Sequence, residues 1–287
     1  MNRRVGTSRV NRSRTGDAVV FLFLLVSGSF MALPMVYAIV NSFKPLNELW
    51  YFPPRFFVEH PTGRNYVELF RMMSNSTVPF LRYVFNTFFI TIIGTFGHIL
   101  LSSMCAYSLS KHHFYGRKLM FQAVVTALMF NSMVVQIPSY LIITRLGMAD
   151  SYLGYIIPAF GMPLGLYLMK QFIEQIVPDT VLEAARIDGA GEFCVFWRLV
   201  MPMVRPAWLT LLINCFQSMW NIGSTTYIFK EQLKTLNYAL SQIMAGGIVR
   251  AGVGAAASVI TMIVPVVLFL LVQSNVVETM STSGMKE

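Results

Sequence analysis

Long apolar runs separated by short polar segments make up most of this chain. A helix needs about 20 consecutive, mainly apolar residues to cross a bilayer, and six runs of this kind follow one another. They are residues 18–41, 83–108, 118–141, 152–172, 204–222 and 254–277. We therefore predict an all-α, polytopic membrane protein with six transmembrane helices, and an outer loop with short helices over residues 44–82.

The segments outside these runs complete the domain plan. Residues 1–17 are a basic N-terminal tail and residues 278–287 a short C-terminal tail, on either side of one transmembrane domain over 18–277. A basic start followed by an apolar run is also typical of a signal peptide, whose apolar region is about 7–15 residues long. The run at 18–41 is longer, so we expect an uncleaved membrane anchor.

Basic residues in the short segments predict the orientation, because Lys and Arg are enriched on the cytoplasmic side of membrane proteins. The loop at 142–151 holds only Arg145. The basic residues of the opposite side are Arg3, Arg4, Arg9, Arg12 and Arg14, then Lys111, Arg117 and Lys118, then Lys170, Arg186, Arg198 and Arg205. Both termini are therefore expected to be cytoplasmic, together with the polar segment at 178–203.

Composition supports the same class. The chain is 55% hydrophobic and 12% charged, against about 25% charged residues in an average soluble domain. Its net charge of +9 could indicate nucleic-acid binding, but the asymmetric loop charges explain it better, so we expect no nucleic-acid partner. The three cysteines, Cys105, Cys194 and Cys215, lie in or beside apolar runs and are expected to be free.

The polar segment at 178–203 has the local signals of two short helices joined by a turn. Thr180 and Glu183 have the spacing of a capping box, which predicts a helix start near residue 180. Gly189 can take the left-handed conformation that ends a helix. Three rings on the second helix should share one side because of their spacing: Phe193, Phe196 and Trp197. The sequence thus predicts an exposed apolar elbow suited to docking.

A known family shares the motif in this segment. Glu183-Ala184-Ala185, Gly189 and Leu199-Val200-Met201-Pro202 resemble the EAA loop of bacterial ABC importer permeases, in which EAA, three residues, Gly, nine residues and Ile-x-Leu-Pro follow one another. The spacing is met in full, and Leu199 and Met201 are volume-conserving replacements. The chain resembles in particular the carbohydrate-uptake permeases of the maltose-permease G-subunit type, over nearly its whole length.

The resemblance implies a type I ABC importer permease in the bacterial cytoplasmic membrane. In that family the loop inserts into a groove on an ATPase subunit that binds ATP and Mg²⁺, so this chain would bind no cofactor itself. The implied partners are a second, unlike permease, an ATP-binding cassette ATPase dimer, an extracytoplasmic solute-binding protein and the bilayer. The tail at 284–287 resembles an ending that reaches the ATPase. The residues implied to contact the ATPase are Glu183, Ala184, Ala185, Arg186, Asp188, Gly189, Phe193, Phe196, Trp197 and Pro202.

Polar residues within the apolar runs are candidates for a substrate pathway. Four residues of the fifth run recur at helical spacing and form a polar stripe beside Trp220: Thr210, Asn214, Gln217 and Asn221. An aromatic ring next to amides commonly holds sugars, and hydrogen bonding between helices is an equal alternative. Asn131 and Gln136 are further candidates. We expect a carbohydrate substrate, and an oligosaccharide in particular, since residues 220–224 and 235–237 resemble the polygalacturonan/rhamnogalacturonan-type branch.

Glycine and proline predict irregular helices. The fourth run contains Pro158, Gly161, Pro163 and Gly165, and Pro265 interrupts the sixth, so we expect kinks in both. Kinks suit a gate, although Gly and Pro are also common in transmembrane helices that have no moving role.

Missing motifs limit the alternatives. No Gly-Lys dipeptide occurs, so the chain lacks a Walker A loop and cannot hydrolyse ATP in the P-loop manner. No Asp, Glu, Lys or Arg is expected deep within a run, which disfavours ion-coupled transport. We therefore expect a transport subunit rather than an enzyme, with no catalytic or metal site. The alternative left open is a stand-alone membrane channel or secondary carrier.

Overall fold

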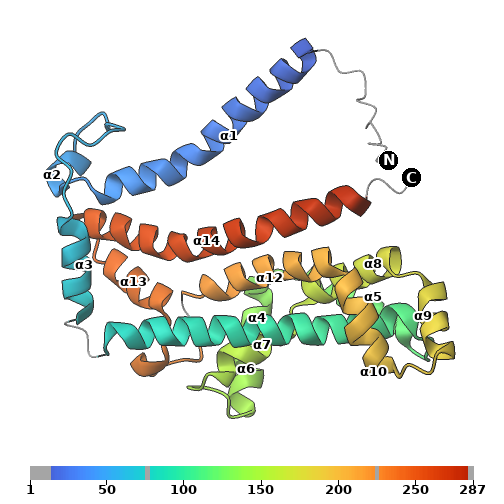
Figure 1. The fold of residues 1–287 in the computed structure, drawn as a ribbon. Helices are drawn as coiled ribbons and strands as arrows, with labels where there is room; N and C mark the ends of the chain where they lie inside the picture. The colour runs from blue at the N-terminus through green and yellow to red at the C-terminus, as the bar shows by residue number, and fades with distance from the viewer. Residues whose placement is uncertain (1–13, 75–77, 224–225, 284–287) are drawn as a thin grey trace.

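The computed structural model describes residues 14–74, 78–223 and 226–283, and every regular element within these ranges is helical (Figure 1). The predicted all-α class is confirmed. The helices are α1 Arg14–Ser42, α2 Leu46–Leu49, α3 Arg64–Ser74, α4 Phe80–Lys111, α5 Arg117–Ala127, α6 Ser132–Arg145, α7 Leu153–Phe160, α8 Pro163–Ile176, α9 Asp179–Ile187, α10 Glu192–Val195, α11 Met201–Met203, α12 Arg205–Trp220, α13 Leu236–Met244 and α14 Ala251–Ser283.

Three of the apolar runs form long helices, as the sequence predicts, although two of these helices contain Pro34 and Pro265. The first, second and last runs lie within α1, α4 and α14, which have 29, 32 and 33 residues. The short helices α2 and α3 fall within the predicted outer loop. The fourth run consists of α7 and α8, interrupted at Gly161 and Met162 before Pro163, which begins α8. The expected irregularity in this run is confirmed. Pro163 has no backbone N–H with which to extend α7, and it occupies the first turn of α8, where none is needed.

The prediction of one continuous helix over 118–141 is wrong. This run is divided into α5 and α6, of 11 and 14 residues, with a turn over 128–131 between them. Asn131 causes a new helix to start, since its side-chain oxygen accepts a hydrogen bond from the backbone N–H of Met133 at 3.0 Å. Asparagine is among the best helix N-caps, so this polar residue divides a segment whose apolar composition alone favours a single span.

The fifth run is also shorter than predicted. Helix α12 has 16 residues, and it meets the segment Glu192–Met203 at an angle of 79°. Within the described ranges, four helical segments are long and apolar enough to cross a membrane, or up to five if this bent pair is one span. The predicted count of six is therefore not confirmed.

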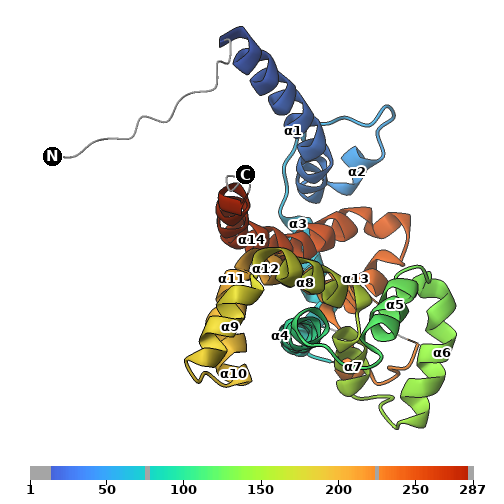
Figure 2. The same ribbon diagram turned by 90° about the vertical axis from the view of Figure 1, so that its right-hand side faces the viewer.

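Helix α4 lies at the centre of the fold (Figures 1 and 2). It contacts α7, α8 and α12, while α14 contacts α1, α3, α12 and α13. Glycines allow this close packing: a Cβ atom at Gly94 would lie 2.7 Å from Met219 Cε, and one at Gly97 would lie 2.2 Å from a ring carbon of Phe160. His98, also on α4, is 2% exposed and lies 3.4 Å from the Ser102 hydroxyl, so it is a packing residue.

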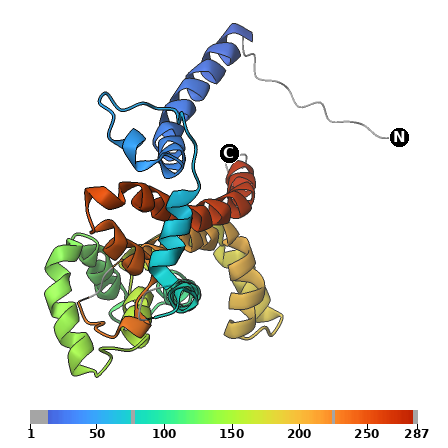
Figure 3. The same ribbon diagram turned by 90° about the vertical axis from the view of Figure 1, so that its left-hand side faces the viewer.

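The two ends of α4 lie in different surroundings. Figures 1 and 3 show α3 and α13 near its first residues, whereas α9 and α10 lie near its last residues (Figure 1). The start of α1 and the end of α14 point toward the same end as α9 and α10 (Figure 1). Apart from its contact with α14 and the hydrogen bonds of Ser42 to Asn65 and Tyr66 of α3, α1 extends away from the other helices, and most of its apolar side chains are exposed.

Candidate functional site

The segment 178–203, here called the elbow, turns sharply at Gly189. The N–H of Ala190 donates to the carbonyl of Ala185 at 3.0 Å, and the N–H of Gly189 donates to that of Arg186 at 3.1 Å. These two bonds are the Schellman motif that closes a helix C-terminus. Gly189 has φ +81°, a left-handed conformation that favours glycine. The predicted turn is confirmed.

The first elbow helix begins near residue 180, as predicted, but without the expected cap. Helix α9 begins at Asp179 after Pro178, and no side-chain hydrogen bond caps it. The capping box expected from Thr180 and Glu183 is therefore wrong. Pro178 occupies the N-cap position, so Thr180 lies inside the first turn, where its hydroxyl cannot act as the cap. Glu183 is exposed instead.

The second half of the elbow leads into the membrane helix through irregular backbone. Helix α10 is followed by one turn of π-helix, Phe196–Val200, and by α11. Between α11 and α12 the chain bends by 79°. The indole N–H of Trp208 donates to the Met201 carbonyl at 3.2 Å, which satisfies one backbone acceptor left by this change of direction.

The exposed face of the elbow includes most of the residues predicted for it. Ile187 and Phe193 are 85% and 72% exposed, and Trp197 lies 6.1 Å from Phe193, ring centre to ring centre. Phe196 is the exception, because it is 4% exposed and packs against Tyr107. The prediction that three rings share one exposed side is wrong for this residue. The other predicted residues at the surface are Glu183, Ala184, Arg186, Asp188, Gly189 and Pro202, and Ala185 is half-buried.

The opposite face of the elbow packs into the body of the protein. Leu182 of α9, Val195 of α10 and Val200 of the π-turn are at most 2% exposed, in one core cluster with Met169 and Ile173 of α8. Burying an aliphatic side chain of this size stabilises by about 1.5–3 kcal/mol. The elbow is therefore held as a fixed projection of the helical body.

A carboxylate that the sequence analysis overlooked joins the two elbow helices. Glu192, the first residue of α10, accepts hydrogen bonds from Arg186 Nε and from the Tyr107 hydroxyl, both at 2.8 Å. His112 Nε2 lies 3.4 Å from the same carboxylate. The opposite charges of Arg186 and Glu192, six positions apart across a predicted turn, were the available signal for the first of these contacts.

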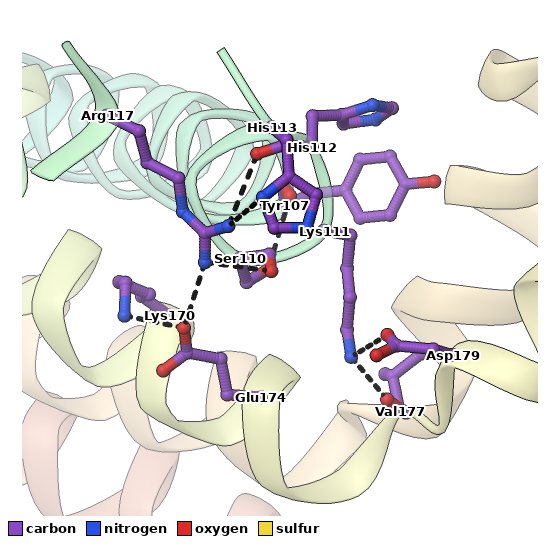
Figure 4. A network of polar contacts seen from close by, with 10 residues as sticks. All are labelled: Tyr107, Ser110, Lys111, His112, His113, Arg117, Lys170, Glu174, Val177 and Asp179. Carbon is purple, nitrogen blue, oxygen red and sulfur yellow. Dashed lines mark hydrogen bonds and ion pairs between the residues drawn. The ribbon is translucent and has the colours of Figure 1, made fainter. Parts of the chain in front are cut away.

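The first elbow helix has its own polar anchor on α4 (Figure 4). Lys111 Nζ donates to the Val177 carbonyl at 2.6 Å and to Asp179 Oδ1 at 2.7 Å. The hydrogen bond from Lys111 and its positive charge lower the pKa of Asp179 below its usual range. Beside this anchor, Glu174 accepts from Lys170 at 2.7 Å and from Arg117 at 3.5 Å. Sequence alone has no signal for contacts between segments this far apart.

The polar stripe of α12 divides into exposed amides and one buried ring. Asn214 and Gln217 are exposed, and Asn214 bonds only within its helix, to the Thr210 carbonyl at 3.1 Å. The cavity beside Asn214 and His98 measures about 90 Å³, whereas ligand pockets usually have about 300–1,000 Å³. The stripe of this chain alone therefore does not enclose a sugar.

Trp220 does not have the position expected of a sugar-binding ring. It is 2% exposed, stacks on Phe216 at 5.8 Å and contacts Phe88 edge to face at 5.2 Å, between ring centres. Its indole N–H donates to the Thr261 carbonyl of α14 at 2.9 Å. Trp220 thus joins α12 to α14 as a packing residue, and its assignment to the substrate pathway is wrong for this conformation.

The remaining pathway candidates are scattered. Asn221 follows the last residue of α12, and its carbonyl accepts from Asn237 Nδ2 at 3.0 Å. Asn131 and Gln136 are exposed, but they belong to the start of α6, which lies apart from α12 in both views (Figures 1 and 2). The structure does not bring these three residues together with Asn214.

The part of the chain that the structure covers contains no candidate metal site. No group of three or more His, Cys, Asp or Glu side chains is placed there to hold an ion. Cys105, Cys194 and Cys215 are free thiols, as predicted. The tail at 284–287 that was expected to reach an ATPase lies outside the described residues.

Comparison with known proteins identifies the family of this chain. Residues 98–281 match the model of the family described as "Binding-protein-dependent transport system inner membrane component". The chain is 33% identical to Protein LplC of Bacillus subtilis over 72% of this chain and 68% of that protein. It is 30% identical to the polygalacturonan/rhamnogalacturonan transport system permease protein YtcP of the same species, over 76% of this chain and 73% of that protein.

A solved structure shows the same fold. The chain superposes on a chain of a bacterial ABC transporter involved in the import of the acidic polysaccharide alginate, with a TM-score of 0.74 and 22% identity over 93% of this chain and 99% of that one. The family match covers most of the chain, including the elbow and α12. The chain therefore belongs to the family of binding-protein-dependent transport system inner membrane components, which are the permease components of ABC importers and not their ATPases.

Proposed function

We propose that this permease component translocates a carbohydrate that an extracytoplasmic binding protein delivers, with energy from a separate ATPase that docks on the elbow. The exposed face of the elbow is the observation that carries the proposal. Ile187 and Phe193 expose apolar surface next to the charged residues Glu183 and Asp188, while Leu182 and Val195 hold the same segment firmly in the core. A fixed, partly apolar projection is suited to transmit force from a bound partner.

The same geometry supports a cytoplasmic position for the elbow end. The start of α1 and the end of α14 lie toward the elbow end of the molecule (Figure 1), where Lys111, Arg117, Lys118 and Arg186 also lie. A cytoplasmic position for this end agrees with the enrichment of basic residues on the cytoplasmic side. ATP and Mg²⁺ would then be bound by the ATPase, on the same side as the elbow.

A second, unlike permease completes the pathway in this proposal. The exposed amides Asn214 and Gln217 enclose no cavity of ligand size within this chain. Polar side chains in a membrane helix need a polar partner or a wet cavity. A facing permease would supply the other wall, and membership in a family of transport-system components favours this assembly over a stand-alone channel or carrier.

The substrate class comes from the relatives. YtcP is described as a polygalacturonan/rhamnogalacturonan permease, and AraQ of Bacillus subtilis, 24% identical over 94% of this chain and 95% of its own, as an arabinooligosaccharide permease. The alginate transporter has the same fold. We therefore expect an oligosaccharide, with uronic-acid oligosaccharides as the first to be tested.

Purification of the tagged chain from native membranes tests the proposal. An ATPase and a second permease should copurify with it, and the reconstituted complex should import oligogalacturonides when a binding protein and ATP are supplied. The matched control is a complex with Gly189→Val, which should import less. Isolation of the chain as an active channel without any ATPase would overturn the proposal.

A further inference from the structure

A pocket rich in basic residues, here called the basic pocket, lies where the loop after α4 enters α5. It has a volume of about 650 Å³ and is lined by residues 113–119, by Phe121 of α5 and by Lys170 of α8. Ligand pockets usually measure about 300–1,000 Å³. Figures 2 and 3 show α5 and the elbow helices on opposite sides of α4, and the lining includes no residue of the elbow. The basic pocket is therefore separate from the surface assigned to the ATPase.

The lining of the basic pocket carries more positive charge than its surroundings balance. Arg117 and Lys170 share the carboxylate of Glu174, which accepts from Lys170 at 2.7 Å and from Arg117 at 3.5 Å (Figure 4). Lys118 is exposed and makes no hydrogen bond or ion pair with the described residues. An anionic ligand would supply the missing negative charge, because an opposite charge nearby stabilises a cation.

Two of these cations are held in place before any ligand binds. Lys170 is 7% exposed, and its ammonium lies 4.0 Å from the centre of the Phe121 ring, which in turn stacks on Tyr167 at 6.0 Å. Arg117 donates to the Ser110 carbonyl at 3.1 Å. A site whose side chains are already fixed loses little conformational entropy when a ligand binds.

The basic pocket lies at the level of the lipid headgroups. Helix α4 has 32 residues and is therefore about 48 Å long at 1.5 Å per residue, whereas a bilayer with its headgroup regions is about 40–45 Å thick. The pocket begins at His113, two residues after the end of α4, and Lys170 lies in the last turns of the candidate span Leu153–Ile176. Lipid phosphates are found at this depth of the membrane.

An exposed, mainly apolar face of α5 leads from the basic pocket into the bilayer. It lines a groove of about 430 Å³ that shares Leu119 with the pocket. Ala123 and Ala127 of this face also line a cavity with Leu101 and Cys105 of α4, so the face runs back alongside α4 toward its middle. The residues of this face recur at helical spacing: Leu119, Gln122, Ala123, Thr126, Ala127 and Phe130.

We propose that the basic pocket binds the headgroup of an anionic phospholipid of the cytoplasmic leaflet, whose acyl chains lie along this face of α5. Basic pockets between membrane helices on the cytoplasmic side bind such headgroups in other proteins. A zwitterionic lipid would bring its own cation to a pocket that already holds three. A free phosphate would leave the apolar face uncovered. The inference goes beyond the proposed transport function and takes from it the orientation that identifies the leaflet.

Native mass spectrometry tests the site, because it counts the ligands bound to each complex. The chain is purified in detergent with the subunits that accompany it and is titrated separately with three probes: dioleoylphosphatidylglycerol, dioleoylphosphatidylcholine and glycerol 1-phosphate. We expect saturable binding of dioleoylphosphatidylglycerol, weaker binding of dioleoylphosphatidylcholine, and no binding of glycerol 1-phosphate at the same concentrations.

Single substitutions assign the binding to this pocket. Lys118→Gln should weaken the binding of dioleoylphosphatidylglycerol by about fivefold, the effect of one cation near an anionic lipid, and Lys118→Arg should bind as the parent does. Arg145→Gln is the matched control, since Arg145 is exposed, makes no hydrogen bond or ion pair with the described residues and lies outside the pocket. Leu119→Gln places an amide where the acyl chains begin and should also weaken binding of this lipid.

The results distinguish a lipid site from the alternatives. Equal weakening by Lys118→Gln and Arg145→Gln would overturn the proposal, because general attraction of charge would then explain the binding. Glycerol 1-phosphate that displaces dioleoylphosphatidylglycerol at similar concentrations would assign the pocket to a soluble phosphate instead. Absence of saturable binding in the parent would show that the pocket takes no lipid when its partner subunits are present. Since none of these measurements uses transport or ATP, the proposed function is tested separately.

Discussion

Lys111, the last residue of α4, donates a 2.7 Å hydrogen bond to Asp179, the first residue of α9, across 68 positions of sequence. The Lys111 side chain is almost fully buried and the Asp179 side chain is largely exposed. The contact therefore fixes the start of the elbow at the edge of the core, where a buried cation is balanced by a carboxylate and by the Val177 carbonyl.

The first prediction concerns the acid stability of this contact. Lys111 holds the pKa of Asp179 below its usual value of 3.8. The ionised carboxylate thus stabilises the folded chain at pH above the unfolded-state pKa, and this contribution is lost as the pH falls through the lower, folded-state pKa. Asp179→Asn should lower the thermal midpoint at neutral pH by a small amount, because the carboxylate is exposed, and should match the parent in acid.

Thermal unfolding of the purified complex between neutral and acidic pH provides the measurement. Asp188→Asn is the matched control, since the Asp188 side chain is exposed and makes no hydrogen bond or ion pair with the described residues, while its backbone N–H, which donates to the Ala184 carbonyl, is unchanged by the substitution. If the thermal midpoints of Asp179→Asn and the parent differ by the same amount at every pH, then ionisation of Asp179 in this contact has no part in stability.

The second prediction concerns the elbow turn. Gly189 and Gly191 are both exposed, and a Cβ atom at either would meet nothing within 4 Å. They differ in backbone conformation, since φ is +81° at Gly189 and −70° at Gly191. Gly189→Val should therefore destabilise by about 1–2 kcal/mol or more and reduce import, whereas Gly191→Val should have little effect on either. Equal thermal midpoints and uptake rates for the two variants would contradict this reading of the turn.

Local and uninterrupted patterns were the predictable part of this fold. The apolar runs of α1, α4 and α14 are long enough to span a membrane, so their helices follow from composition and length. Pro34 and Pro265 do not end α1 and α14. The turn at Gly189 follows from one residue type that tolerates the left-handed region. Asn131 shows the limit of prediction from local pattern. A polar residue within an apolar run suits either a position lining a pathway or a helix N-cap, and here it is an N-cap that divides the predicted third span.

The contacts between helices could not be predicted from the sequence. Helical spacing places Phe193, Phe196 and Trp197 near one another, but it does not say which of them the core will cover, and Tyr107 covers Phe196. Trp220 lies beside amides in the sequence, as a sugar-binding ring would, yet its indole N–H donates to the Thr261 carbonyl of α14. The hydrogen bond from Tyr107 to Glu192 depends on how α4 meets the elbow, which no local signal specifies.

The third prediction separates the two roles considered for Glu183. The structure has no capping box at α9, so Glu183→Ala and Glu183→Gln should both keep the stability of the parent within about 0.5 kcal/mol, as exposed substitutions usually do. If the Glu183 charge contacts the ATPase, both variants should lose stimulated ATP hydrolysis in purified complexes. Full activity of Glu183→Gln would exclude a charge contact, and loss of stability in Glu183→Ala alone would favour a cap.

The fourth prediction concerns orientation. Reporters fused after Arg14 and Arg117 should behave as cytoplasmic, because both positions belong to the elbow end of the molecule with its basic residues. Reporters fused near Gly63 and Lys234, which lie at the other end of α4, should behave as external. Alkaline phosphatase and green fluorescent protein fusions, active on opposite sides of the membrane, give the measurement. A cytoplasmic signal at Gly63 would overturn the proposed topology.

The last prediction distinguishes packing from substrate contact on α12. Trp220 is buried between Phe88, Phe216 and α14 and donates to Thr261, so Trp220→Phe should destabilise the complex by about 1–3 kcal/mol and leave the preference among saccharides unchanged. Asn214→Ala and Gln217→Ala remove exposed amides and should leave stability within about 0.5 kcal/mol, while they change which saccharides are imported or how fast.

Thermal midpoints and uptake of a saccharide panel, measured on the same reconstituted complexes, separate these effects. Asn214 is the sharper probe. Among the described residues its side chain bonds to the Thr210 carbonyl alone, within its own helix, so its removal breaks no hydrogen bond between described helices. If Trp220→Phe changes saccharide preference at parental stability, then the ring leaves its pocket during transport. If the alanine variants import every saccharide as the parent does, the stripe faces a partner helix and hydrogen bonding between permeases explains its polarity.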